Sequence, residues 1–165
     1  MAVKARKLTL MAMLTAIALT IFMIEAQIPT PVPVPGVKLG LANIVTLYAL
    51  FMIGPWDALG ILLARIVLGS LFAGNLMILL YSFAGGLLCW LLCCTLRRVM
   101  TDRQIWLCSI FGAIAHNLGQ MAVAIAVTRT PGLLAYLPAL MISGTLAGAF
   151  TGWSAQFLIA RMKKM

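Results

Sequence analysis

The sequence predicts an all-α membrane protein with six transmembrane helices and cytoplasmic N- and C-termini. Hydrophobic residues make up 64% of the 165 residues and charged residues only 9%, and the mean hydropathy is +1.10. A water-soluble globule would need more polar residues to cover its surface. The apolar residues also fall into six runs, and most basic residues collect on one side of the membrane that these runs predict.

The six apolar runs set the expected helices, since about 20 apolar residues cross the hydrocarbon core of a bilayer. No clear small-x-small cleavage site follows the first run, so we expect it to remain as a span and not to be a cleaved signal peptide. The connections are short, which predicts a single transmembrane domain over residues 1–165 with no extramembrane domain. The expected helices cover residues 8–28, 39–53, 56–72, 76–96, 105–128 and 133–159.

The basic residues predict the orientation of the helices. With the N-terminus in the cytoplasm, nine of the twelve basic residues lie inside, Lys38 and Arg129 lie outside, and Arg65 lies within the membrane. We therefore expect a multi-pass protein of a bacterial plasma membrane, and no nucleic-acid partner despite the net charge of +9. The nine inner residues are Lys4, Arg6, Lys7, Arg97, Arg98, Arg103, Arg161, Lys163 and Lys164.

Prolines at every second position separate the first two runs. Pro29, Pro31, Pro33 and Pro35 have no backbone N–H and bias the preceding residues toward extended geometry. We predict a stiff, polyproline-like outer loop over residues 29–38. Because long apolar runs flank it, we expect this loop to cover the mouth of a pocket between membrane helices.

A few polar residues lie inside the predicted spans, where an ionised side chain costs about 2.5 to 3.5 kcal/mol on insertion scales. Arg65, near the middle of the third span, would pair with Glu25, cap helix carbonyls, or bind an anionic ligand group through its forked donors. His116 and Gln120 share one face of the fifth span, as interhelical hydrogen bonders or as pocket residues. One outward-facing pocket would accommodate these side chains. The candidate substrate-binding residues are Lys38, Asn43, Arg65, Asn75, His116, Asn117 and Gln120.

Small residues and cysteines are expected to serve packing. Glycines at four-residue spacing over residues 144–152 predict close approach of the sixth helix to a neighbour. The four cysteines, at positions 89, 93, 94 and 108, match no closed zinc pattern, and cysteine is an ordinary small apolar residue in membranes. We expect reduced thiols, with no metal and no cofactor.

Several blocks of sequence carry a resemblance to a known family. They are residues 35–47, with the string GVKLGLAN, residues 64–70, residues 115–120, with the string AHNLGQ, and residues 136–138 together with Ser143-Gly144. Through them the chain resembles the Gx transporter family, often labelled heptaprenyl diphosphate synthase component I. That family is similar to the substrate-binding (S) components of energy-coupling factor (ECF) transporters.

The resemblance implies a six-helix subunit, not an enzyme, that captures a small nutrient or cofactor precursor from outside for ATP-driven uptake. Its partners would be a transmembrane coupling protein and two ABC ATPases. S components dock through an Ala-x-x-x-Ala pattern on helix one, which Ala12 and Ala16 match. The same spacing is also common in ordinary helix packing. The polar residues favour a neutral or anionic small-molecule substrate.

Two alternatives remain open. The first is a noncatalytic membrane subunit associated with a heptaprenyl or polyprenyl diphosphate synthase. Prenyl elongation needs clustered carboxylates to hold magnesium ions, whereas the chain has only Glu25, Asp57 and Asp102, so we expect no catalytic residues. Nor does it contain a P-loop or a Ser-His-Asp set. A stand-alone channel ranks last, because the polar residues do not supply a continuous pore lining.

Overall fold

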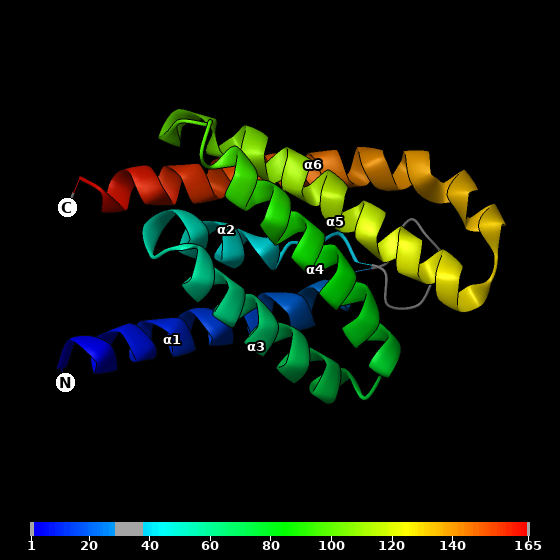
Figure 1. The fold of residues 1–165 in the computed structure, drawn as a ribbon, viewed down its shortest axis with the longest axis horizontal. Helices are drawn as coiled ribbons and strands as arrows, with labels where there is room; N and C mark the ends of the chain where they lie inside the picture. Colours follow the sequence, from blue (N-terminus) through cyan, green and yellow to red (C-terminus); the bar gives the residue numbers. More distant parts are fainter. Residues whose placement is uncertain (1, 29–37, 165) are drawn as a thin grey trace.

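The computed structural model describes residues 2–28 and 38–164 of the chain, and these residues form helices without any strand. The expected proline loop over residues 29–37 therefore lies outside the described residues. Figure 1 shows the arrangement of the helices. In chain order the elements are α1 (Ala2–Glu25), α2 (Asn43–Met52), α3 (Pro55–Ala73), α4 (Leu76–Leu96), the 3₁₀ helix η1 (Asp102–Gln104), α5 (Ile105–Thr128), the 3₁₀ helix η2 (Pro131–Tyr136) and α6 (Leu137–Met162).

Five of the helices, α1 and α3 to α6, are long and apolar enough to cross a membrane. The exception is α2, which has 10 residues where the apolar run 39–53 predicted a longer helix. At 1.5 Å per residue α2 measures about 15 Å, half the thickness of the hydrocarbon core. Gly40 has a φ of +83°, and the helix begins only at Asn43. Residues 38–42 therefore form a non-helical segment ahead of α2.

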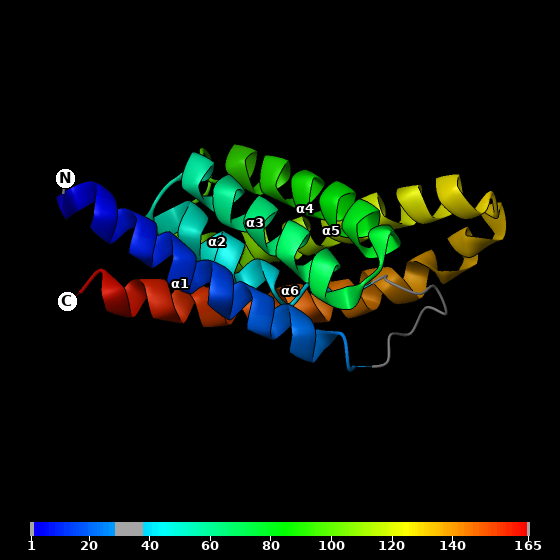
Figure 2. The same ribbon diagram turned by 90° about the horizontal axis from the view of Figure 1, so that it is seen from below.

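The short helix α2 lies at the centre of the bundle. It packs against α1, α3, α4 and α6, and it is surrounded by other helices in the two perpendicular views of Figures 1 and 2. Apolar side chains of α2, among them Leu47 and Leu50, are buried in the main hydrophobic cluster. This packing places the preceding segment 38–42 inside the bundle, where Ala42 is fully buried.

The two ends of the bundle differ in charge. The N-terminus, the α4–α5 connection and the C-terminus lie at one end (Figure 1), which we call the basic end because those segments carry the nine basic residues expected on one side. The described residues form two ion pairs, both at this end: Lys7 Nζ to Asp57 Oδ1 at 2.8 Å and Lys163 Nζ to Asp102 Oδ2 at 2.5 Å. The α3–α4 connection and η2 lie at the opposite end.

Glycines on α6 let this helix pack closely against α5, as their spacing predicted. A Cβ atom at Gly148 would lie 2.9 Å from the Cβ of Ala113, and one at Gly152 would lie 2.6 Å from the Cβ of Ser109. Side chains at these positions would force the two helices apart. The α5–α6 pair therefore forms one wall of the bundle, and the central helix packs against the α6 side of it.

Candidate functional site

Side chains from two neighbouring helices hold the non-helical segment 38–42 in place. The backbone N–H of Lys38 donates to Gln120 Oε1 on α5 at 3.2 Å, and the N–H of Gly40 donates to Glu25 Oε1 on α1 at 2.5 Å. Irregular backbone at membrane depth is tolerated where the protein satisfies its polar groups. Glu25 is buried and anchors this segment.

Arg65 lies near the middle of α3 and is 2% exposed. Its Nη2 donates to Asn43 Oδ1 at 3.3 Å, which joins α3 to the first residue of α2. The expected alternative, an ion pair with Glu25, is not among the ion pairs of the described residues. Arg65 Nε has no hydrogen-bond partner within the described part of the chain. One donor of this buried guanidinium is therefore unsatisfied within the described residues.

Lys38 is a second buried cation close to Arg65. Its Nζ lies 3.4 Å from the centroid of the Phe22 ring on α1, and the Cζ of Arg65 lies 5.8 Å from the same centroid. Gly69 on α3 makes room for this ring, since a Cβ there would lie 2.7 Å from it. Lys38 Nζ has no hydrogen-bond partner among residues 2–28 and 38–164.

His116 lies near the midpoint of α5, between α4 and the segment 38–42. A Cβ at Gly85 would come within 2.9 Å of His116 Nδ1, and one at Gly40 within 3.3 Å of Nε2. The two glycines therefore make space for the imidazole. The structure thus brings together most of the residues that the sequence predicted at a pocket. We call this set the polar cluster: Glu25, Lys38, Asn43, Arg65, His116 and Gln120.

Two of the predicted site residues lie apart from the polar cluster. Asn75 is exposed, and its Oδ1 accepts from Met77 N at 2.9 Å, so its side chain caps the start of α4. Asn117 Nδ2 donates to Leu140 O on α6 at 2.8 Å. Because adjacent residues of a helix point about 100° apart, His116 and Asn117 face different neighbours.

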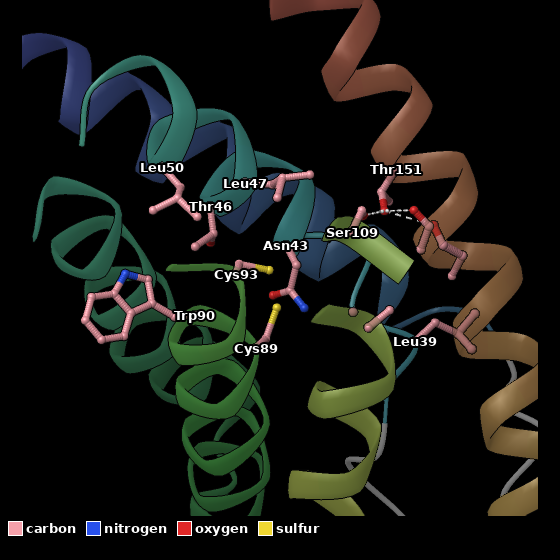
Figure 3. Close-up of a pocket in the computed structure, with 14 residues that line it drawn as sticks. Leu39, Asn43, Thr46, Leu47, Leu50, Cys89, Trp90, Cys93, Ser109 and Thr151 are labelled. Atoms are coloured by element: carbon pink, nitrogen blue, oxygen red, sulfur yellow. Dashed lines mark hydrogen bonds between the residues drawn. The ribbon is translucent and has the colours of Figure 1, made fainter. Parts of the chain in front are cut away.

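A small cavity borders the polar cluster through Gly40 and Asn43 (Figure 3). Side chains of α2, including Thr46 and Leu50, face Cys89, Trp90 and Cys93 of α4 across it, and Ser109 and Thr151 close a further side. The cavity has a volume of about 20 Å³, which is room for about one water molecule. Entry of a nutrient-sized ligand therefore requires the surrounding elements to move apart.

The four cysteines are free thiols, and Cys89, Cys93 and Cys108 are buried at this cavity or beside it. Cys93 Sγ lies 3.6 Å from the backbone oxygen of Cys108, to which it donates a weak hydrogen bond. Gly112 gives the sulfurs space, since a Cβ there would lie 2.6 Å from Cys93 Sγ. These contacts fit the packing role expected for cysteine in a membrane interior.

Ala12 and Ala16, the predicted docking residues, lie in an apolar groove between α1 and α3. Both alanines are exposed, and Gly60 and Ala64 of α3 line the opposite side. The groove has a volume of about 440 Å³. Small residues on both helices leave the backbone accessible, which is the property that close helix–helix association in membranes requires.

Sequence reasoning missed two residues that complete the site. Phe22 gave no signal because an aromatic residue within an apolar run looks like any other lipid-facing or core residue. Gly40 carried a weak signal, since a glycine just before a helix is compatible with positive φ. Glu25 was recognised as an acid at the end of the first span, and only the position of the segment 38–42 gives it a partner.

The fold and the site define a multi-pass α-helical membrane protein with a buried polar cluster that holds more basic than acidic groups. The chain belongs to the family described as "Heptaprenyl diphosphate synthase component I", whose family model matches residues 14–158. This match confirms the family expected from the sequence blocks. No curated protein and no solved structure matches the chain.

Proposed function

We propose that this chain is the substrate-binding membrane component of an ECF-type transporter, which captures a small anionic nutrient or cofactor precursor for ATP-driven uptake. The observation that carries the proposal is the presence of Lys38 and Arg65, both at least nine-tenths buried, each with a nitrogen that has no hydrogen-bond partner in the described residues. Buried cations are costly unless they are paired. A carboxylate or phosphate on the ligand would supply the missing partner.

The charges of the polar cluster support an anionic substrate. Lys38 and Arg65 supply two positive charges and Glu25 one negative charge, and Glu25 already accepts a hydrogen bond from Gly40 N. A ligand with one negative charge would balance the cluster, and its remaining polar groups would meet His116 and Gln120. His116 Nδ1, which faces Gly85 of α4, makes no hydrogen bond in the described part of the chain.

In this proposal the distribution of charged residues determines which end of the bundle faces the cytoplasm. Both termini would lie in the cytoplasm of a bacterial cell, because the basic end would face inward by the positive-inside rule. Because both termini lie at the same end of the bundle, the chain would cross the membrane an even number of times. With five long helices, the segment 38–42 and α2 would together complete the sixth crossing.

The groove of Ala12 and Ala16 is the proposed docking surface for a transmembrane coupling protein that is joined to two ABC ATPases. Ala12→Phe together with Ala16→Phe would fill this groove, and Met13→Phe with Ile17→Phe is the matched control, since Met13 and Ile17 are exposed on α1 outside the groove. After mild detergent extraction from the native host, ATPase subunits identified by mass spectrometry should co-purify with wild type and control but not with the groove variant. Co-purification with all three proteins, or with none, would count against docking.

The family description favours a second candidate function, a noncatalytic membrane subunit associated with heptaprenyl or polyprenyl diphosphate synthesis. The three acids support a noncatalytic role, because Asp57 pairs with Lys7, Asp102 pairs with Lys163, and Glu25 holds Gly40. This function predicts that a soluble prenyl synthase forms polyprenyl diphosphate at a rate that depends on the presence of this membrane protein. A synthase assay with and without this protein in liposomes separates the two candidates, since a transport subunit would leave the output unchanged.

A further inference from the structure

A separate pocket lies at the basic end of the bundle, away from the polar cluster. It is formed where the end of α2, the start of α3 and the end of α4 meet, and its volume is about 310 Å³. Nothing in the proposed uptake function uses this space. The lining residues are Leu50, Pro55, Trp56, Trp90, Cys94, Arg97 and Arg98.

Two tryptophans form the apolar part of this pocket. The ring centroids of Trp56 and Trp90 lie 6.1 Å apart, and Trp90 Nε1 donates to Pro55 O at 3.0 Å, which fixes α4 against the start of α3. Trp56 is 76% exposed. Tryptophan concentrates at the membrane–water interface because its ring is apolar and its N–H is polar. The position of the pair therefore suits contact with lipid just below the headgroups.

Two arginines form the polar part of the pocket. Arg97 follows α4 directly, is half-buried and has its Cζ 5.8 Å from the centroid of the Phe51 ring, whereas Arg98 is exposed. Neither arginine takes part in the ion pairs found among the described residues. A guanidinium presents forked donors that match the oxygens of a phosphate group. The pocket therefore combines an anion-binding part with an apolar wall.

We propose that this pocket binds the phosphate group of an anionic phospholipid, with Arg97 and Arg98 on the phosphate oxygens and the acyl chains along Trp56 and Trp90. Basic pockets between membrane helices are suited to anionic headgroups. The bound lipid joins the α2–α3 hairpin to α4. The same phosphate chemistry is available from a free phosphate compound, and the experiment below distinguishes the two sources.

Native mass spectrometry of the full-length protein, with phosphatidylglycerol or phosphatidylcholine added, tests the proposal. Wild type should retain one phosphatidylglycerol at least tenfold more strongly than phosphatidylcholine, and Arg97→Gln with Arg98→Gln should abolish this preference. Arg161→Gln with Lys164→Gln is the matched control. It also removes two positive charges, but from a different basic surface, which lies beside Phe157 at the C-terminal end of α6. The control should keep the preference. Loss of the preference for phosphatidylglycerol in both variants, or its retention in the Arg97→Gln/Arg98→Gln variant, would overturn the proposal.

Two further measurements complete this test. Arg97→Lys with Arg98→Lys keeps the positive charges but removes the paired N–H donors of the guanidinium groups. This variant should fold and show a reduced but measurable preference for phosphatidylglycerol. An unchanged preference would refute recognition through the guanidinium groups. Pyrophosphate is then added to wild type that holds the lipid. Displacement of the lipid assigns a free phosphate compound as a ligand, and failure to displace it assigns the phospholipid. Displacement would therefore overturn the phospholipid as the occupant of this pocket, and failure to displace it would support the proposal.

Discussion

Arg65 on α3 and Asn43 at the start of α2 are joined by a hydrogen bond of 3.3 Å from Nη2 to Oδ1. This bond links a guanidinium in the middle of the bundle to the end of the non-helical segment 38–42. It is the single side-chain hydrogen bond that Arg65 makes within the described residues. Loss of Asn43 therefore leaves a buried cation with fewer partners, whereas loss of Arg65 removes the cation itself.

Asn43→Ala should reduce the free energy of unfolding by about 1 to 3 kcal/mol, the usual cost of leaving a buried polar group unsatisfied. In an Arg65→Met background the same change should cost less, because the cation that Asn43 serves is absent. Unfolding of the four proteins of this double-mutant cycle by detergent titration provides the measurement. Equal costs in the two backgrounds would show that the two residues are not coupled.

Gly40→Ala should weaken binding of the retained ligand, because the new methyl group would crowd the polar cluster. Its Cβ would lie 2.8 Å from Asn43 Nδ2 and 3.1 Å from His116 Cδ2. Gly74→Ala is the matched control, since Gly74 also has positive φ, +61°, but nothing lies within 4 Å of its Cβ. Both variants should lose about 1 to 2 kcal/mol of stability from backbone strain. The ligand signal in native mass spectra should fall only for Gly40→Ala, and an equal fall in both variants would contradict the close approach.

Hydropathy predicted where the long helices lie, because a membrane span needs a continuous apolar run and the chain has few polar residues to obscure it. The length of α2 was not predictable in this way. Residues 39–42 are apolar or glycine and continue the run, and only the positive φ of Gly40 and the acceptors on Glu25 and Gln120 hold them in a non-helical form. Tertiary contacts decide that conformation.

The polar residues of the site were predictable to the extent that helical geometry fixes their direction. His116 and Gln120, four residues apart on α5, share one face as expected, and in the structure this face meets the segment 38–42. Asn117 faces α6 because it lies beside His116 on the helix, and Asn75 serves as a helix cap, a common role for Asn that its position before α4 allows. The role of Phe22 was not predictable, because it depends on the two cations that lie near its ring in the folded structure.

The central claim is that the polar cluster binds a small anionic molecule through Lys38 and Arg65. Native mass spectrometry of wild type purified in mild detergent from its native host tests it most directly. We expect wild type to retain one small molecule that carries a carboxylate or phosphate, and Lys38→Met and Arg65→Met to lose at least nine-tenths of it. Retention at equal levels in wild type and both variants, or a retained molecule without an anionic group, would contradict the account.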